Sequence, residues 1–178
     1  MPLQGACLCK AIKVEVADEF LPLRVRSLSP LVRKKTTAAY LGPALFAMCY
    51  CQNCATSHSA PGCLVAGMLT KFLKVTGTPS TYRDVDTDSG KAVIRAFCGT
   101  CGTPIRSWPE HNTDVTALRA GLFAKTNQDG TAEAAAGNSG FVYPAPISEL
   151  YTERRNHQFP WVAPQDGAKE WPRMEKFE

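Results

Sequence analysis

The sequence lacks any long hydrophobic run and any sign of a secretion signal. No apolar stretch approaches the roughly 20 residues that span a membrane. The N-terminus, MPLQGACLCK, has no basic region followed by an apolar one. Strong charge is missing too, because 20 basic and 16 acidic residues leave a formal net charge of +4. We therefore expect a cytoplasmic protein without a membrane or nucleic-acid partner.

Long helical periodicity is also missing, and the patterns that remain are short. In AIKVEV, residues 11–16, apolar and polar residues alternate as they do in a half-buried strand. Turn residues separate this segment from others like it, so the sequence predicts a mainly β fold of short antiparallel strands with little helix. One or two helical turns are expected after Cys54. The expected strands cover residues 11–16, 44–48, 64–68, 81–83, 92–96, 104–107 and 115–119.

The length of 178 residues suits a single domain, residues 1–178. Residues 26–43 have a basic cluster and no clear period, which indicates an inserted loop. The tail from about residue 151 contains Trp161 and Trp171. We expect this tail to wrap the body of the domain and to be anchored by those two rings.

Eight cysteines in a chain without a secretion signal indicate metal binding or catalysis rather than disulfides. In CGTCG, the two residues between Cys98 and Cys101 allow a tight turn that aims both sulfurs at one metal ion. The glycines relieve backbone strain in such a turn. A structural zinc ion takes four ligands, and Cys7 and Cys9 are the candidates for the other two. The alternative for that pair is a disulfide or a mixed site.

Cys49, Cys51 and Cys54 form a second group, with one ligand fewer than a structural zinc site needs. Three protein ligands and an open position are typical of a functional zinc ion. Zinc with three thiolates has a net charge of −1, which makes it a weak activator of water and suits it to exchanging a further thiolate. A redox dithiol is the alternative, although no thioredoxin-like βαβ unit is readable here. The ligands therefore favour thiol chemistry.

Two side chains near this group bear on its function. Cys63 is expected to be a small buried core residue, and His58 a surface residue. If either closed the open position, the chain would be better interpreted as a non-catalytic zinc-binding interaction module. His111 and His157 have no expected role. Four basic residues near the cysteine motifs are expected to be solvated: Arg83, Lys91, Arg95 and Arg106.

The order Cys-x-Cys, then Cys-x-Cys-x-x-Cys, then Cys-x-x-Cys-Gly resembles the glutathione-dependent formaldehyde-activating enzyme family, which includes centromere protein V. The resemblance extends over GACLCKAIKVEV, CYCQNCATSHSAPG, RAFCGTCGTPI, LRAGLF and PISELYTERRNHQFPWV. It implies a β-tent fold with two Zn²⁺ ions. By residue match, the structural ion would be held by Cys7, Cys9, Cys98 and Cys101, and the catalytic ion by Cys49, Cys51 and Cys54.

The activity that the resemblance implies is a carbon–sulfur lyase reaction that joins glutathione to formaldehyde and gives S-hydroxymethylglutathione. The expected partners are thus a small-molecule thiol and an aldehyde or related electrophile. An alternative is a specialised biosynthetic enzyme that acts on another activated carbonyl or thioether. The family often has histidine and arginine where this chain has Tyr50 and Ala55. We expect these two departures to change the immediate surroundings of the second zinc ion.

Overall fold

The computed structural model describes residues 3–17, 45–126, 146–164 and 166–172. The expected insertion at residues 26–43 lies outside them. Within the described residues the fold is mainly β, as predicted, with two short α-helices. Across these residues, no helix combines the length and the apolar character needed to cross a membrane.

The N-terminal half contributes β1 (Leu3–Ala6), β2 (Lys13–Val16), β3 (Leu45–Cys49), α1 (Gln52–His58), β4 (Cys63–Leu69) and β5 (Leu73–Thr76). The rest contributes β6 (Ser80–Asp84), β7 (Val93–Phe97), β8 (Pro104–Pro109), β9 (Val115–Arg119), β10 (Ser148–Leu150), α2 (Thr152–Gln158) and β11 (Lys169–Trp171). Two single-turn 3₁₀ helices, Thr70–Phe72 and Ala120–Phe123, follow β4 and β9.

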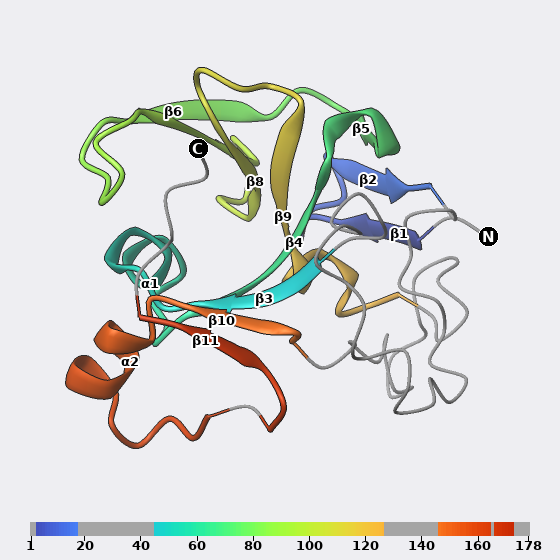
Figure 1. The fold of residues 1–178 in the computed structure, drawn as a ribbon. Coiled ribbons are helices and arrows are strands. Elements are labelled where there is room, and N and C mark those ends of the chain that lie inside the picture. The colour runs from blue at the N-terminus through green and yellow to red at the C-terminus, as the bar shows by residue number, and fades with distance from the viewer. Residues whose placement is uncertain (1–2, 18–44, 127–145, 165, 173–178) are drawn as a thin grey trace.

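The strands form two sheets. A three-stranded sheet has the order β1-β2-β5, and an eight-stranded sheet has the order β11-β10-β3-β4-β9-β8-β7-β6. Most neighbours are antiparallel, but β10 runs parallel to both β3 and β11, which the expectation of antiparallel strands did not include. Because β3 and β10 run in the same direction and each leads into a helix, α1 and α2 lie together at one end of the sheet (Figure 1).

The main core lies between the two sheets. Gly5 in β1 allows Phe123 to pack directly against this strand, since a Cβ atom there would lie 2.7 Å from Cδ1 of Phe123. Cys7 and Cys98 belong to this core, so the first cysteine group is attached to it through two of its four members, while Cys9 is exposed. Its large buried side chains include Leu3, Val14, Val16, Met68, Ile105, Leu118 and Phe123.

Trp161 is 73% exposed and does not anchor the tail, so that part of the expectation is wrong. Trp171 is half-buried and lies opposite Leu150 in the pairing of β11 with β10. A buried polar network of Tyr50, Glu149 and Arg155 also holds this part of the chain. The Tyr50 hydroxyl donates to Glu149 Oε1 at 2.7 Å, and Arg155 Nη1 donates to Glu149 Oε2 at 2.7 Å. Burial and the hydrogen bond to Glu149 raise the pKa of Tyr50 far above its usual value. The network ties α2 and β10 to the residue that follows β3.

Replacing Arg155 with alanine should destabilise the protein strongly, because it leaves the Glu149 carboxylate buried at 0% exposure without its cation. Loss of one partner of a buried pair costs about 3–5 kcal/mol. The matched control is Arg154→Ala, which removes a partly exposed pair with Asp88 and should cost at most about 1 kcal/mol. Denaturant unfolding of both variants measures the difference, and equal losses would contradict the role given to the network.

Candidate functional site

The first sulfur cluster joins two loops that are far apart in the sequence. Cys7 and Cys9 follow β1, Cys98 and Cys101 follow β7, and the four sulfurs all lie within 4.8 Å of one another. The Cys7–Cys9 and Cys9–Cys98 sulfur distances are both 3.6 Å. Sulfurs held tetrahedrally about 2.3 Å from zinc lie about 3.8 Å apart, so the spacing fits a metal ion. All eight cysteines are free, so the structure contains no disulfide between Cys7 and Cys9.

Backbone turns aim these sulfurs inward. Gly102, with φ 72°, lets its N–H donate to the Cys98 carbonyl at 2.8 Å, which is the strain relief that its position predicted. Lys10 takes a similar left-handed φ of 63° after the first pair. Backbone N–H groups, that of Cys101 first, lower the pKa of Cys98, and the contact with Thr103 lowers the pKa of Cys101 to about 5. Such thiols are readily held as metal-binding thiolates.

The second cluster, called here the cysteine triad, consists of Cys49, Cys51 and Cys54, whose sulfurs lie within 4.8 Å of one another. Cys49 ends β3, and Cys51 caps the N-terminus of α1 by accepting the Cys54 N–H on its sulfur at 3.3 Å. The helix therefore begins on a metal-ligating type of side chain instead of the usual serine or aspartate. Cys54 lies in the first turn of α1, so the short spacing of the three cysteines in the sequence brings their sulfurs close together.

The turn that carries the triad is braced from both sides. Asn53 Nδ2 donates to Asp84 Oδ2 of β6 at 2.9 Å, and Gln52 Oε1 accepts from Arg154 Nη1 of α2 at 3.2 Å. Both residues between Cys51 and Cys54 are thus held by other elements. This bracing keeps the three sulfurs in position on a rigid part of the fold.

Three adjacent thiols cannot all ionise without a compensating positive charge. Contacts with the Cys49 and Cys51 sulfurs, followed by the charges of Arg119 and Arg95, lower the pKa of Cys54 to about 2. Contacts with the other two sulfurs, together with burial, raise the pKa of Cys49 well above its usual value. Ionisation of Cys54 is thus favoured, whereas ionisation of the other two thiols is disfavoured. A bound divalent cation would instead stabilise all three thiolates. The donor set therefore fits a thiophilic metal ion such as zinc.

Arg119, at the end of β9, is the functional residue that the sequence analysis missed. It is buried at 5% exposure, and its Nη1 lies 4.0 Å from the Cys54 sulfur and 3.9 Å from the Cys63 sulfur. Its Nη2 donates to Ser107 Oγ at 2.9 Å. A buried guanidinium needs an anionic partner, and the triad with its thiolates is the one beside it. Its place in the LRAGLF segment, quoted above for the resemblance, is the signal that could have found it.

Cys63 and His58 do not belong to the triad's cluster of ligand atoms in the described residues. His58 Nδ1 lies 2.9 Å from the Cys54 carbonyl oxygen, which can only accept, so Nδ1 carries the proton. His58 Nε2 is then free to accept from the Cys63 thiol at 3.3 Å. Cys63 is buried, as expected, and the two side chains are partners of each other instead of caps on the triad.

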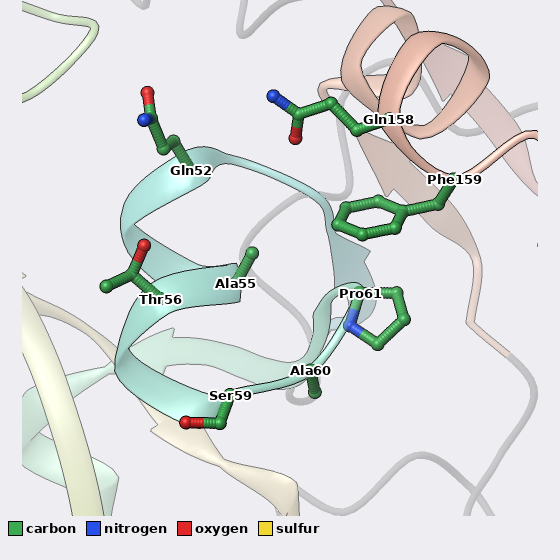
Figure 2. Close-up of a pocket in the computed structure, with 8 residues that line it drawn as sticks. All are labelled: Gln52, Ala55, Thr56, Ser59, Ala60, Pro61, Gln158 and Phe159. Atoms are coloured by element: carbon green, nitrogen blue, oxygen red, sulfur yellow. The ribbon is translucent and has the colours of Figure 1, made fainter.

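Tyr50 and Ala55 each have neighbours outside the triad, and their expected effect on the surroundings of the second zinc ion stays a prediction. The Tyr50 side chain points to Glu149, because neighbours in an extended segment alternate in direction and Cys49 and Cys51 take the other side. Ala55 lines an open groove of about 470 Å³ between α1 and the end of α2, with Gln52, Thr56 and Phe159 (Figure 2).

A smaller cavity, called here the arginine pocket, has a volume of about 200 Å³ and is lined by Arg95, Arg119, His58 and Tyr82, among others. Arg119 belongs both to this cavity and to the surroundings of the triad. Arg95 was expected to be solvated, but its side chain is only 16% exposed and its Nε donates to Asp84 Oδ2 at 2.7 Å.

The other three basic residues near the motifs are placed differently. Arg83 is exposed and pairs with Glu110, and Lys91 is exposed in the hairpin between β6 and β7. Arg106 also borders the arginine pocket, but its guanidinium lies over the Trp108 ring, 4.3 Å from the ring centroid.

Comparison with known protein families shows which family the chain belongs to. A family model described as "Glutathione-dependent formaldehyde-activating enzyme" matches residues 31–137, which is more than half of the chain. The chain belongs to this family. The part that matches the glutathione-dependent formaldehyde-activating model contains the triad, Cys98 and Cys101, whereas Cys7 and Cys9 precede it.

Other comparisons add little to the glutathione-dependent formaldehyde-activating family assignment. A comparison with curated proteins found no match. Among solved structures, a Rhodobacter sphaeroides protein determined by structural genomics is similar, with 17% sequence identity and a TM-score of 0.43. The alignment covers 74% of this chain and 97% of that chain.

The two clusters predict a metal content of two zinc ions per chain. Cys49→Ala should reduce the count to one, because two sulfurs cannot hold the ion. Cys98→Ala should also leave one ion and should lower the melting temperature more, since Cys98 belongs to the main core. Elemental mass spectrometry of the purified proteins measures the counts, with Cys63→Ala as the control that keeps both ions. An unchanged count in Cys49→Ala would rule out the second site.

Proposed function

We propose that this chain is a zinc-dependent carbon–sulfur lyase, of the S-(hydroxymethyl)glutathione synthase type, that acts on a thiol and a small aldehyde. The observation that carries the proposal is the triad, three sulfurs within 4.8 Å that neither Cys63 nor His58 completes. Family membership supplies the substrate class, glutathione and formaldehyde. The eight free cysteines favour a reducing compartment such as the cytoplasm.

The proposed reaction is an addition without oxidation or reduction. The thiol sulfur forms a bond to the aldehyde carbon while the carbonyl π bond breaks, and the proton of the thiol ends on the oxygen. The product is a hydroxymethyl thioether, and the reverse reaction releases the same two molecules. The step needs a thiolate near neutral pH and an anion-tolerant site around it.

When bound, zinc supplies a Lewis acid that keeps a substrate sulfur in its thiolate form. Cys49, Cys51 and Cys54 would hold that ion, and Cys7, Cys9, Cys98 and Cys101 would hold a structural one. Arg119 offsets the negative charge that thiolates bring to the triad. The bonds from Asn53 to Asp84 and from Arg154 to Gln52 keep the turn from moving when substrate enters.

Replacing Cys54 with serine should abolish catalysis and leave the fold intact, because Cys54 is buried in the smaller of the two apolar clusters and serine has nearly the same size and shape. Thiols add to formaldehyde without a catalyst, so the quantity to measure is the exchange rate between ¹³C-formaldehyde and its glutathione adduct by exchange NMR. We expect wild type to accelerate the exchange and Cys54→Ser to return it to the uncatalysed rate.

Thr56→Ala is the matched control, because Thr56 lies on the opposite face of the same helix and lines the open groove (Figure 2). It should keep the wild-type exchange rate. Full activity in Cys54→Ser would contradict the assignment of the triad as the catalytic centre. A wild-type protein that binds two zinc ions without accelerating the exchange would favour a zinc-binding interaction module.

A further inference from the structure

One edge of the Arg95 guanidinium is engaged in a hydrogen bond within the protein, and its other edge is available to bind a ligand. Its Nε donates to Asp84 Oδ2 at 2.7 Å, and no further hydrogen bond is found for it among the described residues. Asp84 is buried at 5% exposure, so it fixes the guanidinium and does not swing out to solvent. The two Nη groups of Arg95 therefore remain for a second planar anion.

The same carboxylate links Arg95 to the triad. Asp84 Oδ2 also accepts from Asn53 Nδ2 at 2.9 Å, and Asn53 is the residue directly before Cys54. The chain Cys54–Asn53–Asp84–Arg95 thus fixes the distance between the triad and the available edge of Arg95. A substrate held by both would have its sulfur and its anionic group positioned by one rigid unit.

The surroundings of Arg95 match an anionic arm of limited size. It lines the arginine pocket with Arg119 and His58, and Tyr82, its partner across β6 and β7, is 60% exposed. The cavity of about 200 Å³ is smaller than the sites of about 300–1,000 Å³ that enclose whole ligands of drug size. It therefore suits one arm of a thiol substrate, and Arg119, which lines it, also lies 4.0 Å from the Cys54 sulfur of the triad.

We propose that Arg95, oriented by Asp84, binds a carboxylate of the thiol substrate in the arginine pocket. This inference rests on the proposed function and adds the residue that selects acidic thiols over neutral ones. Glutathione has two carboxylates, one on its glycine and one on its γ-glutamyl residue, and the shared chemistry is a planar anion that accepts two N–H bonds.

The test compares wild type, Arg95→Gln and Arg83→Gln. Arg83 is the matched control, because it is a neighbouring arginine of the same hairpin that pairs with exposed Glu110 outside the pocket. The thiols are glutathione, its glycyl ethyl ester and an analogue with the γ-glutamyl carboxylate converted to an amide. We expect Arg95→Gln to lose about tenfold to a hundredfold in kcat/KM with glutathione, chiefly through KM. Arg83→Gln should match wild type.

The loss in Arg95→Gln should disappear with one of the two modified thiols, and that thiol identifies the carboxylate that is bound. An equal loss with all three thiols would overturn the proposal, because it would mean that Arg95 only supports the structure. Zinc content should stay at two ions per chain in Arg95→Gln, which separates a binding defect from a folding defect.

A second measurement keeps this inference separate from the proposed function. S-methylglutathione has both carboxylates but no thiol hydrogen, so it cannot react. Calorimetry should show that it binds wild type about tenfold or more tightly than Arg95→Gln. Arg95-dependent binding without any catalysed exchange would refute the lyase function and keep the anion site. Catalysed exchange together with equally tight binding to wild type and Arg95→Gln would support the lyase function and refute the anion site.

Discussion

The crowding of sulfur governs this structure. Thiolates packed within 4.8 Å repel one another, so each cluster exists only where positive charge or N–H dipoles compensate for it. The first cluster is served by backbone N–H groups in two loops. The triad has fewer such donors, and a buried guanidinium from β9, Arg119, lies 4.0 Å from the Cys54 sulfur. The chemistry of the triad therefore depends on the position of β9 in the sheet, which places Arg119 beside the start of α1.

Spacing and alternation predicted much of this from the sequence. The seven expected strands are present, and the sulfurs within each short cysteine motif lie close together as their spacing indicated, because ligand turns and half-buried strands are local features. β1, β5, β10 and β11 were not expected, since strands of three or four residues carry too little periodicity. The burial of Arg95 and Arg119 depends on which strands lie opposite α1, and a sheet order of this kind is not encoded locally.

The two departures from the family pattern, Tyr50 and Ala55, have neighbours on two different sides of the segment that contains the triad. Tyr50 directs its hydroxyl to Glu149 in a buried network with Arg155, on the side of the segment opposite the sulfurs. Ala55 faces the open groove between the two helices. The side chains packed around the triad come from β3, β4, β9 and β10 and from Tyr151, which precedes α2 with a left-handed φ of 61°.

Zinc X-ray absorption of the wild-type chain, recorded before and after glutathione is added, tests the open position of the triad most directly. Four sulfurs at one ion and three at the other predict an average of about 3.5 sulfurs per zinc in the free protein. Glutathione should raise the average towards about 4 as its sulfur fills the open position. An average of about 4 before glutathione, or no change after it, would contradict a second metal centre that is open to a substrate thiol.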